Sequence, residues 1–433
     1  MRSSRWTALA TALAMAGAAA ACGRDVRPYD GPHLRLAVDG RVNDNVSASA
    51  RGNMVAVSWS GTVRDTTDVY VAVSVDGGRS FGAPRQVNTV PGDARVSGEQ
   101  PPRAVLIPDP DGFPQALVVW TRKDPAGTRI AWSYTKDGTT FSPAALVPGA
   151  DGAGNRGWES IARSDSDRVF ALWLDHRETA NAAVAPMHRH EAGAAPMEMK
   201  VTDAPTADPV ARAGLSRLWF SSVDGVIPAR AIASGVCYCC KTALAAAGNR
   251  VVAAWRHVYP GNQRDIAFTE STDGGRTFRA PVRVSEDHWK FDGCPENGPA
   301  IAIDPAGATH VAWVTPRDGV DGAPLALYVA STADGATFSP RAEVRTAGAV
   351  AHVQLVAERS GGLVLAWDEA TPAGRVVRVA RGSAAGNGAV FRTPLTMPGT
   401  GDHPALAASD SGTTLAWVRR DAAPSVIGVI RVP

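Results

Sequence analysis

The chain has little net charge, little lysine, and no long basic or apolar run in its body. Its 433 residues include 44 Lys and Arg against 42 Asp and Glu, for a net charge of +2, and only five are lysine. The absence of a basic run argues against a nucleic-acid partner. No apolar stretch of membrane-spanning length follows residue 22, which argues against a helical transmembrane domain.

Cysteine is scarce as well, and the first of the five ends an N-terminal leader. Arg2 and Arg5 give the leader a positive start, residues 8–21 form a run of small apolar residues, and Cys22 follows directly. This arrangement resembles a bacterial lipoprotein signal, with Ala19 where such signals usually carry Leu. Ordinary secretion, with cleavage after an Ala-x-Ala sequence, is the alternative.

We therefore expect residues 1–22 to be a signal peptide and residues 23–32 to be a short tether. Cys22 is predicted to carry a lipid that anchors the exported protein to a bacterial membrane, on the periplasmic side or at the cell surface. Disulfides persist in these compartments.

What the sequence does contain is a repeat. Seven short apolar segments each end in tryptophan, at intervals of 50 to 82 residues: Trp59, Trp120, Trp173, Trp255, Trp313, Trp367 and Trp417. A polar turn and a second apolar segment usually precede each one, as expected of β-hairpins. Units of this size predict an all-β, seven-bladed β-propeller over residues 33–433, with six blades as the alternative. The last unit lacks a fourth strand, which we expect residues 33–38 to supply.

A second pattern marks turns between strands. Ser74-Val75-Asp76-Gly77-Gly78-Arg79-Ser80-Phe81 recurs around Asp273, and shortened forms occur at Asp137 and Asp334. The carboxylate of each Asp can accept backbone N–H bonds, and the following Gly permits positive φ. We interpret these four aspartates as structural.

These turns resemble the Asp-box, or bacterial neuraminidase (BNR), repeat of the sialidase-like β-propellers, and the likeness covers residues 33–433. Cys237-Tyr238-Cys239-Cys240, together with the Gly-Cys-Pro sequence at Cys294, is similar to an exported subgroup with this cysteine signature. The resemblance implies the propeller fold. It is a weak indication of function, because the same repeat marks many propellers that are not enzymes.

Strand alternation in a propeller blade places the entrances to the innermost strands and the exits of the tryptophan strands on one face. The four cysteines after the leader and most histidines fall on this face. An insertion at about residues 176–215, with His188 and His190, leaves from it too. Such a concentration predicts the functional face.

Two interpretations of the cysteines stay open. A disulfide is the default in an exported protein, either from Cys237 or Cys240 to Cys294 or between Cys239 and Cys240. Metal is the alternative, because cysteine with histidine suits Cu(I) or zinc. The tentative histidine ligands are His188, His190, His352 and His403.

Two functions follow. The first is a protein that binds a metal (Cu or Zn) or a small extracellular ligand at the cysteine-rich face. The second, implied by the resemblance, is an exo-α-sialidase-type glycoside hydrolase, in which arginines clamp the substrate carboxylate and a tyrosine is the nucleophile. Arg103, Arg256 and Arg317 are weak candidates for the clamp and Tyr259 for the tyrosine. The early Arg-Ile-Pro motif of sialidases is absent.

Overall fold

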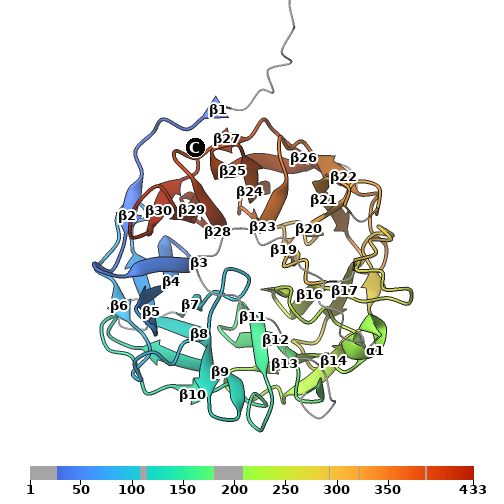
Figure 1. The fold of residues 1–433 in the computed structure, drawn as a ribbon, viewed down its shortest axis with the longest axis horizontal. Coiled ribbons are helices and arrows are strands. Elements are labelled where there is room, and N and C mark those ends of the chain that lie inside the picture. Colours follow the sequence, from blue (N-terminus) through green and yellow to red (C-terminus); the bar gives the residue numbers. More distant parts are fainter. Residues whose placement is uncertain (1–26, 108–114, 180–207, 292, 321, 386–387) are drawn as a thin grey trace, which may run out of the picture.

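The computed structural model describes residues 27–107, 115–179, 208–291, 293–320, 322–385 and 388–433. The described chain forms seven sheets arranged as a ring around a central axis (Figure 1), and all their strand pairs are antiparallel except the short pair of β1 with β27. The prediction of an all-β, seven-bladed propeller is confirmed. The leader, Cys22, residues 23–26 of the tether, His188 and His190 lie outside the described residues.

Each blade begins at the axis and runs outward. The first four blades are, from inside to outside, β3 (Val42–Arg51), β4 (Met54–Val63), β5 (Thr66–Ser74) and β6 (Arg85–Gln86); β7 (Arg103–Ile107), β8 (Gln115–Asp124), β9 (Gly127–Thr135) and β10 (Ala145–Leu146); β11 (Arg156–Arg163), β12 (Val169–Asp175), β13 (Arg217–Ser222) and β14 (Arg230–Ser234); β15 (Ala243–Ala247), β16 (Arg250–Arg256), β17 (Ile266–Ser271) and β18 (Val282–Arg283).

The remaining blades follow the same order. Blade five is β19 (Ala300–Ile303), β20 (Thr309–Pro316), β21 (Leu325–Thr332) and β22 (Ala342–Val344); blade six is β23 (Val350–Ala357), β24 (Gly362–Thr371), β25 (Gly374–Ala385) and β27 (Leu395–Thr396), with β26 (Gly388–Phe391) beside β25 and β1 (Arg27–Pro28) beside β27; blade seven is β28 (Gly401–Ser409), β29 (Gly412–Arg419), β30 (Val426–Arg431) and β2 (Leu34–Leu36).

The core lies between the blades. All seven repeat tryptophans sit on the second strand of a blade and are at most 1% exposed. The apolar clusters combine residues of neighbouring blades: Val118 of blade two packs with Val71 of blade one, for example. Because each blade buries its faces only against its neighbours, the ring is stable as a whole rather than blade by blade.

Asp-box turns hold the outer hairpins as predicted. Asp76 Oδ1 accepts the N–H groups of Arg79 and Ser80, and Oδ2 accepts the Ser80 hydroxyl. These hydrogen bonds lower the pKa of the Asp76 carboxyl, and the equivalent bonds do the same at Asp137, Asp273 and Asp334.

A β-bulge marks the start of the innermost strand in four blades. The register shifts there, and the residue at the shift has positive φ: Asn45, Trp158, His352 and His403. A bulge redirects side chains locally. This feature places two histidines at the axis.

Between β12 and β13, the described residues include one short helix, α1 (Pro209–Gly214), which Asp208 caps. It falls within the predicted insertion. Among the described residues, no helix has the length and hydropathy needed to cross a bilayer.

The two ends of the chain close the ring. β2 pairs antiparallel with β30, so residues near the N-terminus complete blade seven as predicted. Asn43 secures this closure: its Oδ1 accepts the N–H of Val38 and the indole N–H of Trp59, and its Nδ2 donates to the carbonyls of Arg41 and Ser425. Asn43 is 1% exposed, so these bonds are shielded from water.

We predict that Asn43→Ala lowers the free energy of unfolding by about 2–4 kcal/mol, because it leaves several buried partners without a hydrogen bond. Chemical denaturation measures the change. The control is Asn53→Ala, at an exposed position in the turn between β3 and β4, which should cost less than about 0.5 kcal/mol. Equal losses in the two variants would contradict a role of Asn43 in closure.

Candidate functional site

Four cysteines meet where blades four and five begin, and we call them the sulfur cluster. Cys237, Cys239 and Cys240 precede β15, and Cys294 precedes β19. Cys239 and Cys294 form a disulfide with a Cα–Cα distance of 6.0 Å, whereas Cys237 and Cys240 are free and buried. The expected link between the two blades is present, but through Cys239 rather than Cys237 or Cys240.

Local backbone pairing explains this choice. Val236 forms a β-bridge with His257, and the N–H of Cys237 donates to the carbonyl of Arg256. These contacts tie Cys237 to its own blade. Cys239, two residues further along, is the one that reaches Cys294 in blade five.

The two free thiols touch each other and an arginine. The Sγ atoms of Cys237 and Cys240 are 3.3 Å apart, and the Sγ atoms of Cys237 and Cys239 are 3.9 Å apart. Arg264 Nη1 lies 3.3 Å from Cys237 Sγ. A hydrogen bond from Cys240 and the charges of Arg264 and Arg256 lower the pKa of the Cys237 thiol, while burial and the neighbouring thiolate raise that of Cys240.

An apolar and aromatic shell encloses the sulfur cluster. Ala213 of α1, Val258 and the partly buried Trp158 pack against the cysteines. The guanidinium groups of Arg212 and Arg264 lie 4.3 and 5.6 Å from the ring centre of Tyr238. Cys237, Cys239 and Cys240 are buried in this shell and Cys294 is partly buried, and burial strengthens the interactions of the sulfur atoms with charge.

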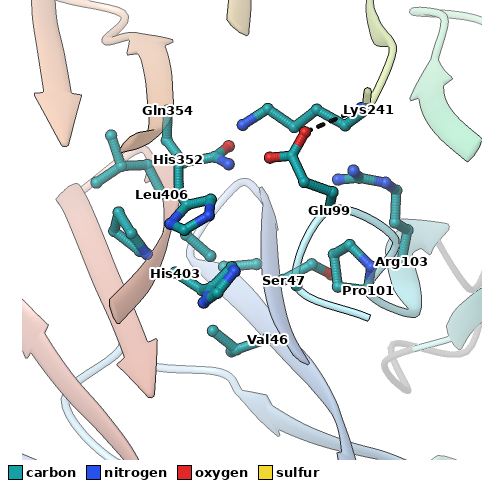
Figure 2. Close-up of a pocket in the computed structure, with 14 residues that line it drawn as sticks. Val46, Ser47, Glu99, Pro101, Arg103, Lys241, His352, Gln354, His403 and Leu406 are labelled. Carbon is teal, nitrogen blue, oxygen red and sulfur yellow. Dashed lines mark hydrogen bonds between the residues drawn. The ribbon is translucent and has the colours of Figure 1, made fainter. Parts of the chain in front are cut away.

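Next to the sulfur cluster, a small polar cavity lies at the ring axis, and we call it the axial pocket (Figure 2). It holds about 40 Å³. Its polar lining consists of Ser47, Glu99, Arg103, Lys241, His352, Gln354 and His403. Lys241 belongs to both features, because it directly follows Cys240.

Glu99 and Lys241 form hydrogen bonds that connect different parts of the axial pocket wall. Glu99 Oε2 accepts the backbone N–H groups of Lys241 and Gly298, both at 3.0 Å. The Lys241 side chain crosses to blade six, where Nζ donates to the carbonyl of Val353 at 2.6 Å. Burial lowers the pKa of Lys241 to about 8, so its ammonium group is still largely protonated at neutral pH.

His352 and His403 stack at the axis. Their ring centres are 3.8 Å apart, at an interplanar angle of 24°. His352 Nδ1 lies 2.7 Å from Asp368 Oδ2, and His403 Nδ1 lies 2.8 Å from Asp402 Oδ1. The bonded Nδ1 atoms leave Nε2 as the second polar atom of each ring. Gly98 is needed here, because a Cβ atom at this position would lie 1.8 Å from His403 Nε2.

His352 and His403, which the sequence offered as metal ligands, therefore line the axial pocket, and the three sulfurs of Cys237, Cys239 and Cys240 group without them. Sequence reasoning gave Glu99 and Lys241 no role. It missed Arg264, which follows the loop after β16 and occupies no repeat position.

The structure does not bring the predicted sialidase residues together. Arg103 lines the axial pocket. The guanidinium of Arg256 instead donates hydrogen bonds to the backbone carbonyls of Asn297, Arg264 and Val314. Arg317 is exposed and pairs with Glu343. The ring of Tyr259 packs against His257 and under Arg283.

The electrostatics of the axial pocket can be tested at His403. Burial alone would lower its pKa, but the hydrogen bond to Asp402 and the charges of Asp402 and Asp368 outweigh burial and raise it. Protonated His403 therefore stabilises the fold below the unfolded-state pKa. This contribution is lost as the pH rises through the higher folded-state pKa.

We predict that Asp402→Asn lowers the pKa of His403 by about one pH unit or more, because it removes the paired carboxylate. An NMR titration of the histidine ring protons measures it. Asp421→Asn, which removes the carboxylate paired with Arg419, is the control and should leave this titration unchanged. An unchanged His403 pKa in Asp402→Asn would contradict the pairing.

No family model matches the chain, and no curated protein matches it. Solved structures do. An ulvan lyase, described as a new family of polysaccharide lyase, is similar with a TM-score of 0.55 and 10% identity, over 93% of this chain and 96% of the lyase. A leech intramolecular trans-sialidase aligns with a TM-score of 0.43 and 10% identity, over 84% of this chain and 79% of that chain. Identities this low show the fold alone, and that fold is the β-propeller.

Proposed function

We propose that this protein is an exported, lipid-anchored propeller that binds one Cu(I) or zinc ion at the sulfur cluster. The observation that carries the proposal is the grouping of three buried sulfurs: the Sγ atoms of Cys237, Cys239 and Cys240 all lie within 4.8 Å of one another. Cys294 Sγ is bonded to Cys239 and so belongs to the same group.

The spacing suits thiolate coordination. A tetrahedron with Zn–S bonds of about 2.3 Å has S–S edges of about 3.8 Å. The distances from Cys237 Sγ to Cys240 Sγ and to Cys239 Sγ are 3.3 and 3.9 Å. Reduction of the Cys239–Cys294 disulfide would supply four thiols, a complete set for structural zinc. With the disulfide intact, two thiols remain, and soft thiolates favour Cu(I).

The surrounding charge also suits thiolates. Metal ligands must be deprotonated, and Arg264 beside Cys237 stabilises the thiolate form. Arg264 Nη1 donates a hydrogen bond to Cys237 Sγ at 3.3 Å, whereas Nε and Nη2 are buried and have no hydrogen-bond partner among the described residues. A site with several thiolates has a negative net charge, which Arg264 and Arg256 offset.

The second candidate is a glycoside hydrolase of sialidase type. The likeness of fold to an ulvan lyase over 93% of this chain favours a carbohydrate-active protein in general. Two observations weigh against the hydrolase. The candidate arginines are dispersed, and an axial pocket of about 40 Å³ has room for a few water molecules but not for a sugar ring.

We predict that the reduced protein binds about one zinc or Cu(I) ion per chain, and that the disulfide-intact protein binds Cu(I) but not zinc. Cys237→Ser should abolish binding in both states. Metal analysis after purification without chelators, followed by competition with a chromogenic chelator, measures this. Cys22→Ser is the control, because it changes a cysteine outside the sulfur cluster.

Absence of bound metal in both redox states, with Cys237 and Cys240 also oxidised, would make the sulfur cluster a disulfide staple. Hydrolysis of a fluorogenic sialoside that survives Cys237→Ser but is lost in Arg103→Ala and Arg256→Ala would make the hydrolase the primary function.

The anchor has its own test. In a bacterial host fed a labelled fatty acid, the wild-type protein should incorporate label and sediment with membranes, whereas Cys22→Ala should do neither, because the acceptor thiol is gone. Cys237→Ser is the matched control and should stay labelled. Export of an unlabelled, soluble wild-type protein would support ordinary secretion instead.

A further inference from the structure

Two side chains from different blades reach the axial pocket with N–H groups that are not used in hydrogen bonds within the described part of the protein. Lys241 Nζ makes one hydrogen bond, to the carbonyl of Val353, which leaves two of its N–H groups for another acceptor. Arg103 Nε donates to the carbonyl of Glu159 at 2.5 Å. Among the described residues, no hydrogen-bond acceptor is found for the two terminal nitrogens of Arg103. Figure 2 shows both cationic side chains on the same side of the pocket as Glu99.

One acceptor faces these donors. Glu99 is 5% exposed, and its Oε2 is fully occupied by two backbone N–H groups. Its Oε1 is buried and has no hydrogen-bond partner among the described residues. A buried carboxylate oxygen that accepts no hydrogen bond lowers the stability of the fold. We therefore expect a bound molecule to donate a hydrogen bond to this oxygen.

The charge and size of the axial pocket further limit the kinds of ligand that it can bind. Arg103 and Lys241 contribute two positive charges, and Glu99 contributes one negative charge. The carboxyl group of Glu159 also acts on Arg103, but burial raises the pKa of Glu159 and so disfavours its charged form. The carboxylates of Asp368 and Asp402 lie behind the histidines, where Asp368 also pairs with Arg375 and Asp402 with Arg420. A volume of about 40 Å³ admits a few water molecules or a small polyatomic ion.

The geometry points to a site for a small oxyanion that still carries a proton, of the hydrogen phosphate class. We propose that Arg103 and Lys241 donate hydrogen bonds to its anionic oxygens, while Glu99 Oε1 accepts the hydrogen bond of its O–H group. Fully deprotonated sulfate would place an anionic oxygen against Glu99 and leave two acceptors facing each other. The site should therefore distinguish phosphate from sulfate.

This site is separate from the sulfur cluster, although the peptide bond between Cys240 and Lys241 connects the two. It needs no metal and no free thiol. Phosphate binding is therefore measured with a chelator present and repeated in Cys237→Ser, so that its outcome is independent of metal binding.

The experiment is isothermal titration calorimetry of the full exported chain with inorganic phosphate and with sulfate at neutral pH. We expect phosphate to bind at least about tenfold more tightly than sulfate. Arg103→Gln should weaken phosphate binding by about tenfold to a hundredfold, because one charged hydrogen bond is worth that much. Arg317→Gln, which removes an exposed arginine paired with Glu343, is the matched control and should bind phosphate as the wild type does.

Glu99→Gln is the sharper variant. Its amide oxygen can still accept the N–H groups of Lys241 and Gly298, while its NH₂ group replaces the free acceptor with a donor. We expect sulfate to bind Glu99→Gln as well as phosphate does. If this variant unfolds on heating well below the wild type, Arg103→Gln and its control carry the test.

Three results would overturn the proposal. The first is no phosphate binding to the wild type at millimolar concentration. The second is equal binding of phosphate and sulfate that Arg103→Gln does not weaken. The third is phosphate binding that disappears in Cys237→Ser or with the chelator, which would assign the anion to the sulfur cluster or to a bound metal.

Discussion

The carboxylate of Glu99 holds together the part of the ring on which both sites depend. It lies at the start of blade two, yet its Oε2 bonds the backbone of Lys241 and Gly298, where blades four and five begin. Lys241 follows Cys240, and Gly298 lies four residues after Cys294. Because a buried carboxylate is tolerated only when donors surround it, these three strand entrances must keep their relative positions. The same side chain then presents its free oxygen to the axial pocket.

The fold was predictable because its determinants are local and repeated. Seven tryptophan strands gave the number of blades, and the missing strand of the last unit located β2 as its partner. The Asp-box turns could be assigned from the residues alone, since the carboxylates of Asp76 and its counterparts bond only to groups within four residues. Strand alternation also placed the cysteines on one face, and all four that follow the leader do meet there.

The site itself depended on contacts that no local pattern encodes. The disulfide forms through Cys239, whereas the bridge between Val236 and His257 ties the neighbouring Cys237 to its own blade. Arg256 fitted a carboxylate clamp by residue type, but its guanidinium bonds backbone carbonyls of two blades. Such roles depend on contacts between residues that are far apart in the sequence, and the repeat pattern does not indicate which residues make them.

The short separation between the two sites makes them energetically dependent on each other. The charge of Glu99 acts on Cys240 and on Lys241, and the charge of Cys240 acts on Lys241. If both sites are loaded as proposed, thiolates formed by reduction add negative charge beside the anion pocket and weaken oxyanion binding. A bound metal ion would cancel part of that negative charge and so restore the affinity for the oxyanion. By linkage, the oxyanion must then favour the metal-loaded cluster over the bare thiolates by the same free energy. Through the buried carboxylate of Glu99, the sulfur cluster and the axial pocket can therefore influence each other by charge alone, without any change of fold.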